Sequence, residues 1–240
     1  MNEYPKRLIE VDLPIARISA HARREKSIRH GHISTLHIWW ARRPLAACRA
    51  VICAALWPDP VDLTTWAERG DLRKDEMPAV NGTIIIRPGR FLTEARRLMT
   101  LWAQERLSKA SQESYARLVA IQKEPKRLDD PEELRCILLD FIADFANWDN
   151  STDKDYLATA RALTQAAHEA LGGEPGTRPL LVDPFAGGGS IPLEALRVGA
   201  DAFASDLNPV AVLLNKVVLG STSPSTARGS LMRFASGGSG

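Results

Sequence analysis

The residues of this sequence best suited to chemistry are three glycines and a carboxylate near its end. Gly187, Gly188 and Gly189 follow an apolar run at 180–182, and Asp206 lies 19 residues after Gly187. Glycines at a strand-to-helix turn let backbone N–H groups approach a ligand because no Cβ lies in the way, and the positive end of the following helix attracts polar groups. A carboxylate at the tip of the next strand accepts hydrogen bonds from two ribose hydroxyls. The spacing therefore predicts a site for a cofactor that contains a nucleoside.

The elements that must position these residues are predicted by the same stretch. Residues 180–182 have the composition of a buried parallel strand, and a helix is expected over 191–197. Residues 202–205 predict a second strand that ends in Asp206. Asn208 caps a further helix that continues to Lys216. The order of elements predicts an α/β fold that contains the first βαβα unit of a parallel sheet.

Two other interpretations of the glycines stay open. Gly187 and Gly189 fit the first part of a GxGxxG pattern, but Pro192 occupies the third glycine position. The close packing of helix on strand in NAD-binding sites is therefore not specified, although a dehydrogenase fragment remains an alternative. The other alternative is a flexible loop without a ligand.

The first zone of the chain, residues 1–57, is basic. Residues 1–50 carry ten Lys and Arg against four Asp and Glu, although the net charge of the whole chain is +2. Such a segment can face phosphate in nucleic acid or in a cofactor, and the alternative is a solvated basic face. Four of the five histidines lie here, without the spacing of metal ligands, and the three cysteines form no CxxC pair, so no metal site is predicted.

The remaining zones are assigned no chemistry. Residues 58–178 are predicted to be mainly helical, with helices over 91–107, 112–124 and 152–171 and a further helix that starts at Asp130-Pro131. The apolar face of this last helix contains Leu134, Leu138, Phe141, Ile142 and Phe145. Residues 220–240 include 13 Gly, Ser or Thr and are predicted to be disordered.

The longest apolar run has eight residues, whereas a membrane-spanning helix needs about 20. The start of the sequence has no apolar core of the kind found in signal peptides. We therefore expect no membrane partner and a cytoplasmic location.

Three motifs resemble a known family. DPFAGGGS resembles the DPFxGxG motif of amino-group DNA methyltransferases, which binds S-adenosyl-L-methionine, and SDLNPVAV resembles the motif that follows it. HIWWARRPL resembles the HPxxKPL element, which precedes the glycine turn in circularly permuted members. Over roughly residues 5–60 and 179–218, the chain is most similar to DUF1156-type adenine-specific DNA methylases, which often carry a zinc ribbon further on. Residues 58–178 would be an insertion.

The resemblance implies a Rossmann-like sheet at 179–219 and roles for individual residues. Arg42 or Arg43, beside Pro44, would pair with the methionine carboxylate, the alternatives being phosphate contact or solvation. Trp39 and Trp40 would stack on a base or line the cofactor, or else anchor the helix that Pro44 begins. Asp206 would bind the ribose, with Leu207 and Asn208 beside the adenine. The turn that cradles the cofactor would consist of Asp183, Phe185, Ala186, Gly187, Gly188, Gly189 and Ser190.

The catalytic loop of this family is missing from the sequence. Its (D/N/S)PP(Y/F/W) motif accepts hydrogen bonds from the amino group and stacks on the flipped base, but this chain has no Pro-Pro pair, so no catalytic residue is assigned. Only two strands of the expected sheet are encoded. We therefore expect a fragment, a truncated gene product or part of a split enzyme, inactive alone, whose complete form acts on DNA and which a second polypeptide could complete.

A further expectation follows from the incomplete sheet. An unpaired strand predicts an exposed apolar surface around 180–182 and 210–218. The alternative function is a non-catalytic nucleic-acid-binding or scaffolding subunit of a methylase or restriction-like system, which would use the basic first zone.

Overall fold

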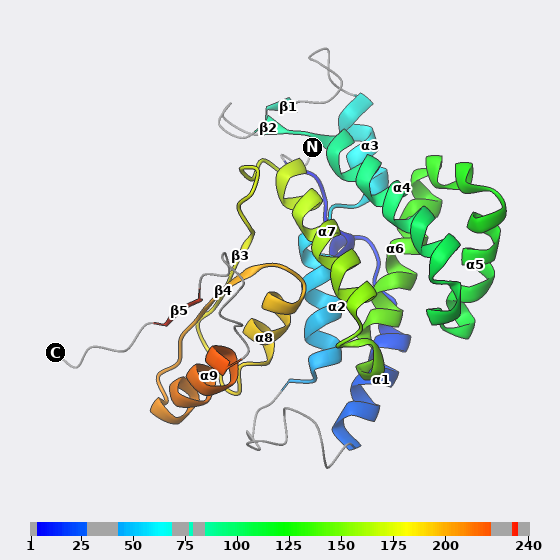
Figure 1. Ribbon diagram of the computed structural model, residues 1–240. Coiled ribbons are helices and arrows are strands. Elements are labelled where there is room, and N and C mark those ends of the chain that lie inside the picture. The colour runs from blue at the N-terminus through cyan, green and yellow to red at the C-terminus, as the bar shows by residue number, and fades with distance from the viewer. Residues whose placement is uncertain (1–3, 28–42, 69–76, 79–84, 222–231, 235–240) are drawn as a thin grey trace.

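The chain folds into a helical body that carries a small parallel sheet at one side (Figure 1). The computed structural model describes all residues except 1–3, 28–42, 69–76, 79–84, 222–231 and 235–240. Its elements are η1 (Leu8–Glu10), α1 (Ile15–Ser27), α2 (Leu45–Leu56), α3 (Pro60–Glu68), β1 (Met77–Pro78), β2 (Ile85–Ile86), α4 (Pro88–Glu105), η4 (Leu107–Lys109), α5 (Gln112–Lys123), η5 (Pro125–Asp129), α6 (Pro131–Ala146), η6 (Trp148–Asn150), α7 (Lys154–Ala170), β3 (Leu180–Asp183), α8 (Ser190–Arg197), β4 (Asp201–Ala204), α9 (Pro209–Ser221) and β5 (Met232–Phe234).

The helical body forms around α6, and the predicted helices are confirmed with shifts of a few residues at their ends. The Asp130 carboxylate accepts a hydrogen bond from the N–H of Glu132, which satisfies a free donor in the first turn. All five residues of the predicted apolar face of α6 are buried. Phe141 lies at the centre of an aromatic cluster, with ring centroids 5.0 Å from Trp102 and 5.3 Å from Tyr156. Burial of this face against the neighbouring helices stabilises the body.

The sheet has the order β3-β4-β5, and both pairings are parallel. Strands β3 and β4 pair from Leu180 opposite Asp201 to Asp183 opposite Ala204, with α8 between them in the chain. The prediction of a disordered tail over 220–240 was wrong at Met232–Phe234, which forms β5, and α9 extends to Ser221. The free edge of β4 supplies backbone hydrogen-bond partners to β5, which composition alone does not show.

The predicted apolar surface is present. On β3, Leu180 and Val182 are exposed, and on α9, Val210, Leu213 and Val217 are exposed. Strand β4 is the one neighbour of β3 in the part of the chain that the structure describes. One face of β3 and one side of α9 therefore present apolar side chains to solvent.

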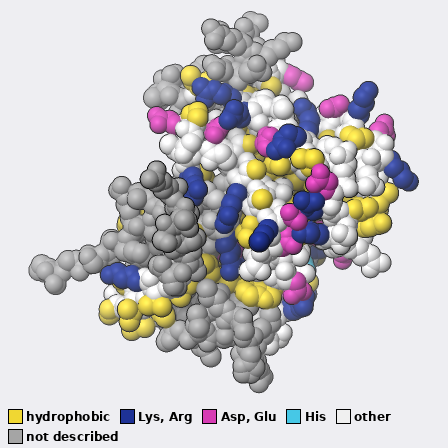
Figure 2. Space-filling view, in the orientation of Figure 1, with side chains coloured by type: hydrophobic (Ala, Val, Ile, Leu, Met, Phe, Trp, Pro, Cys, Tyr) yellow, Lys and Arg dark blue, Asp and Glu magenta, His cyan; other side chains and the backbone are white. Residues whose placement is uncertain are grey.

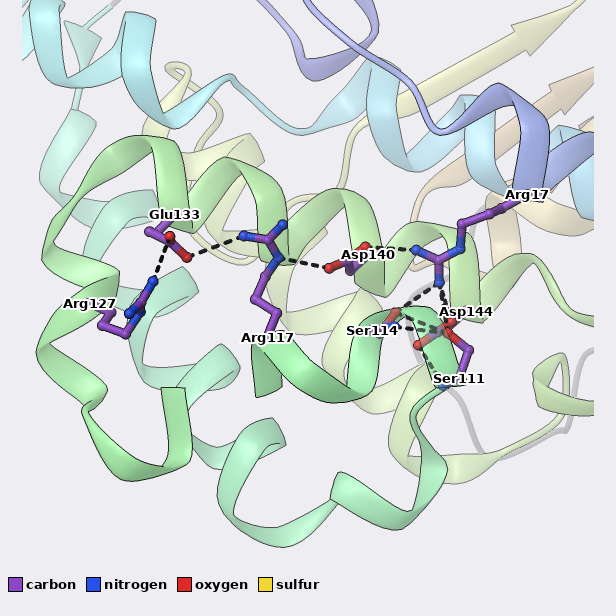
Figure 3. A network of polar contacts seen from close by, with 8 residues as sticks. All are labelled: Arg17, Ser111, Ser114, Arg117, Arg127, Glu133, Asp140 and Asp144. Atoms are coloured by element: carbon purple, nitrogen blue, oxygen red, sulfur yellow. Dashed lines mark hydrogen bonds and ion pairs between the residues drawn. The ribbon is translucent and has the colours of Figure 1, made fainter. Parts of the chain in front are cut away.

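Arginines of the basic first zone contribute to the fold through a polar network that joins α1, α5 and α6 (Figure 3). Arg17 donates to Asp140 at 2.7 Å and to Asp144 at 2.5 Å, and also to the hydroxyls of Ser111 and Ser114. The network continues through Arg117, which contacts Asp140 and Glu133, to Arg127. Arg24 likewise pairs with Asp149. The charge excess at the start of the chain is thus partly neutralised by carboxylates further along.

A buried ion pair connects α2 to α8. The Arg49 guanidinium donates to both carboxylate oxygens of Glu194, at 2.7 and 3.2 Å, and the two side chains are 1% and 0% exposed. Arg49 also donates to the Phe145 carbonyl oxygen at 2.5 Å and lies 4.8 Å from the centre of the Phe145 ring. Arg197 gives Glu194 a second cation at 2.5 Å. The buried guanidinium of Arg49 and the buried carboxylate of Glu194 are both hydrogen-bonded, so α8 is fixed against the helical body.

The cysteines of the helical body are buried or partly buried and carry no charge. Burial raises the pKa of the Cys48 thiol to about 12 and also raises the pKa of Cys53, so both are uncharged thiols. Within the described ranges, no group of three His, Cys, Asp or Glu side chains is arranged to hold a metal ion. No helix in those same ranges combines the length and the apolar character that crossing a membrane requires.

We predict that Glu194→Gln lowers the free energy of unfolding by about 3 kcal/mol, because the Arg49 guanidinium stays buried after its anionic partner is removed. Urea unfolding followed by circular dichroism measures this change. Glu94→Gln is the control, since Glu94 pairs with Arg97 at the surface and its loss should change the free energy by less than about 0.5 kcal/mol. Equal effects of the two substitutions would contradict the role given to the buried pair.

Candidate cofactor site

The glycine turn joins the end of β3 to the start of α8. The Asp183 carboxylate accepts a hydrogen bond from the N–H of Phe185 at 3.1 Å, which begins the turn. Gly187 and Gly189 adopt left-handed conformations with φ of 51° and 77°, and Gly189 is the N-cap of α8. Residues with a Cβ rarely adopt this conformation, so the turn requires glycine at these two positions.

Asp206 lies against this turn, as the spacing predicted. One carboxylate oxygen of Asp206 accepts a hydrogen bond from the N–H of Gly187 at 2.9 Å, and the other accepts from the N–H of Asn208 at 2.8 Å. The backbone adds a second connection, since the N–H of Ala186 donates to the Ser205 carbonyl oxygen at 3.0 Å. A carboxylate has about four lone-pair sites, so Asp206, which is partly exposed, keeps acceptor capacity for a ligand.

Asp183 and Arg43 bring charge to the base of the turn. Burial raises the pKa of the Asp183 carboxyl above its ordinary value, while the Phe185 N–H and the Arg43 guanidinium act to lower it. The positive charge of Arg43 thus acts on Asp183, and the Arg43 side chain is exposed. Pro44, the other predicted site residue of this segment, is the N-cap residue of α2.

The other predicted site residues differ in their exposure to solvent. Phe185 is 79% exposed and Leu207 is 95% exposed, so two apolar side chains border the turn. Asn208 is also exposed, and its side chain accepts a hydrogen bond from the N–H of Val210 at the start of α9. Ala186 and Gly189 are buried, whereas Gly187, Gly188 and Ser190 are half-buried. Trp39, Trp40 and Arg42 lie outside the described residues.

Sequence reasoning missed Asn215 on α9, which is 2% exposed and holds the turn from behind. Its Nδ2 donates to the carbonyl oxygen of Gly187 at 3.0 Å and to that of Ala211 at 2.8 Å. Its Oδ1 has no hydrogen-bond partner and would lie 2.6 Å from a Cβ at position 189. The signal in the sequence was an amide within the run at 210–219, which is apolar apart from Asn215 and Lys216.

Glu25 on α1 was also missed. Its two carboxylate oxygens accept hydrogen bonds from the N–H groups of Leu45 and Ala46, each at 2.9 Å. The positive end of α2 is thus neutralised by a buried carboxylate of the chain itself. Among the described residues just before α2, Arg43 carries a positive charge that can attract an anionic part of a ligand.

The similarity to known proteins lies at the start of the chain. Residues 12–80 match the model of a family described as "Protein of unknown function (DUF1156)", which supports the resemblance for this domain. No curated protein matches the chain, and no solved structure does. The glycine turn and Asp206 lie outside the matched residues.

We predict that Gly189→Ala destabilises the protein by more than about 1 kcal/mol, because alanine resists φ of 77° and its Cβ would clash with Asn215. Gly176→Ala is a matched control: φ is 81° there, but a Cβ would meet no atom within 4 Å. Urea unfolding should show a larger loss of stability at position 189 than at 176. Measured in the Asn215→Ala background, Gly189→Ala should cost no more than Gly176→Ala does, and a larger loss that is independent of Asn215 would refute the contact.

Proposed function

We propose that this chain is the cofactor-binding half of an S-adenosyl-L-methionine-dependent DNA methyltransferase of the adenine-N6 type. The observation that carries the proposal is the contact between Asp206 and the N–H of Gly187. It brings a carboxylate and a glycine turn together at the carboxyl ends of two parallel strands, where α/β sheets bind nucleotides. The arrangement β3–α8–β4–α9 is thus consistent with the first unit of a Rossmann-like sheet.

The residues at the turn fit the parts of this cofactor. Asp206 would accept hydrogen bonds from the two ribose hydroxyls, since its oxygens are already directed by the N–H groups of Gly187 and Asn208. The exposed side chain of Leu207 would cover one face of the adenine. Arg43 would pair with the methionine carboxylate, because a guanidinium matches a carboxylate with two parallel hydrogen bonds. S-adenosyl-L-methionine supplies an activated methyl group on its sulfonium.

The sequence supplies no side chain for the second half of the reaction. Activation of an exocyclic amine requires acceptors placed against the amino group, and no Pro-Pro loop is encoded. We infer that residues outside the given sequence activate the amine, because none within it is suited to this step. Within the described residues β3 pairs with β4 on one side, so its other edge offers backbone groups to a further strand of the sheet.

A second candidate function is a non-catalytic nucleic-acid-binding or scaffolding subunit. Its support was the basic charge of residues 1–50. The internal pairing of Arg17, Arg24 and Arg49 weakens this support, because these cations already contact carboxylates of the chain.

Calorimetric titration of the full chain with S-adenosyl-L-methionine, S-adenosylhomocysteine and NAD tests the proposal. We expect binding of the first two and none of NAD. Asp206→Asn should weaken binding by about 10- to 100-fold, the effect of losing hydrogen bonds to a charged group. Glu132→Gln, which removes an exposed carboxylate on α6, should leave binding unchanged.

Adenosine analogues separate a ribose contact from a change in the turn. The wild-type protein should prefer adenosine to 2′,3′-dideoxyadenosine, and Asp206→Asn should reduce this preference. Equal affinity of the wild-type protein for the two nucleosides would overturn the ribose assignment, and tight NAD binding would favour a dehydrogenase-type site.

A further inference from the structure

A cavity of about 270 Å³ lies where the start of the described chain meets the C-terminal end of α7. Its walls come from the residues before η1, the last turn of α2, the end of α7 with the turn that follows it, and the residue before β3. The hydroxyl of Tyr4 donates to the Leu171 carbonyl oxygen at 2.9 Å and so joins the first of these segments to the end of α7. The volume is close to the lower end of the range of about 300–1,000 Å³ that is usual for small-molecule sites.

Arg7 brings a positive charge to this cavity, and it forms no ion pair with any residue that the structure describes. Its Nη1 donates to the Leu56 carbonyl oxygen at 3.4 Å, and its guanidinium lies 5.2 Å from the centre of the Tyr4 ring. The carboxylate of Glu10 accepts a hydrogen bond from the backbone N–H of Arg7 and not from its side chain. A guanidinium has five N–H donors, so Arg7 keeps several of them for a ligand.

Burial makes an anion beside Arg7 favourable. It lowers the pKa of the Arg7 guanidinium below its ordinary value, although Tyr4 and Glu10 act in the opposite direction. A charge that is removed from water without an anion close by raises the free energy of the folded chain. None of the lining residues in the described part of the chain is Asp or Glu, so a negatively charged ligand would bind more tightly than a neutral one.

Other polar side chains around the cavity are already engaged. The Nε2 atom of His168 lies 2.9 Å from the hydroxyl oxygen of Thr177, and burial lowers the pKa of His168, which favours the neutral imidazole. Thr164 is 0% exposed, and its hydroxyl oxygen accepts a hydrogen bond from the Trp57 Nε1–H at 3.0 Å. The polar end of a ligand is therefore expected at the guanidinium of Arg7.

We propose that this cavity binds a small organic acid that has one carboxylate and an apolar body. The fork of the Arg7 guanidinium matches a carboxylate with two parallel hydrogen bonds. The side chains of Leu56, Leu171 and Pro179 line the cavity and can contact the rest of the molecule. A phosphate carries more charge at neutral pH and would require a second permanent cation, which the described lining does not supply.

The cavity is separate from the candidate cofactor site and from the apolar surface of α9. Pro179 precedes β3 and the glycine turn follows it, so the cavity and the cofactor site lie at opposite ends of this strand. The exposed hydrophobic side chains of α9, which Figure 2 shows gathered over this helix, do not line the cavity. The inference therefore does not rest on the proposed methyltransferase function.

Titration of the full chain with benzoate, benzamide and inorganic phosphate, followed by ligand-observed NMR, tests the proposal. Benzoate should bind at least about tenfold more tightly than benzamide, its uncharged counterpart, because hydrogen bonds between charged groups are the stronger ones. Arg7→Gln should weaken benzoate binding by about 10- to 100-fold and remove the preference for benzoate over benzamide. Lys6→Gln is the matched control: it removes the neighbouring positive charge, which does not line the cavity, and should leave benzoate binding unchanged.

A second variant tests the apolar part of the site. Leu56→Phe keeps Arg7 and narrows the cavity, so it should weaken the binding of benzoate more than that of acetate. Urea unfolding of each variant distinguishes a loss of binding from a loss of the fold. Saturation with S-adenosyl-L-methionine should leave benzoate binding unchanged.

Four results would overturn the proposal. They are equal affinity of the wild-type protein for benzoate and benzamide, tighter binding of phosphate than of benzoate, unchanged benzoate binding in Arg7→Gln, and displacement of benzoate by S-adenosyl-L-methionine. Because the two sites share no residue, the cofactor titration can fail while benzoate still binds, and the two proposals are tested separately.

Discussion

The buried ion pair between Arg49 and Glu194 determines how the glycine turn sits on the helical body. A guanidinium and a carboxylate without contact to water are tolerated only when their geometry satisfies both groups, and here Phe145 and Arg197 complete the set. Glu194 lies in α8, the helix that begins at the glycine turn. Arg49 lies in α2, the helix that follows Arg43. Two segments more than a hundred residues apart are thereby held in one geometry.

Local patterns predicted the parts of the fold that depend on local physics. The cap at Asp130, the apolar face of α6 and the approach of Asp206 to Gly187 all follow from spacing and residue type. The roles of Glu25, Arg49 and Asn215 could not be predicted, because each depends on a partner brought near by packing. The pairing of β5 with β4 was missed for the same reason: composition describes the tail but not the strand edge beside it.

The number of arginines in a segment did not predict which of them can contact an external anion. The excess of arginine at the start of the chain suggested a surface for phosphate, but Arg17 and Arg49 are partnered by carboxylates from α6 and α8. The helical region after it, to which no chemistry was assigned, contains Arg161, which forms no ion pair among the described residues. Pairing in three dimensions, rather than composition, decides which cations can meet an external anion.

The two N–H groups that hold Asp206 have a consequence for affinity. A carboxylate on a free loop would lose rotamer entropy on meeting a ligand, which weakens association. The Asp206 side chain is already oriented by Gly187 and Asn208, so that loss occurs when the chain folds. A ligand arriving at this position meets a rigid acceptor, and its discrimination between molecules with and without a matching pair of donors is correspondingly sharp.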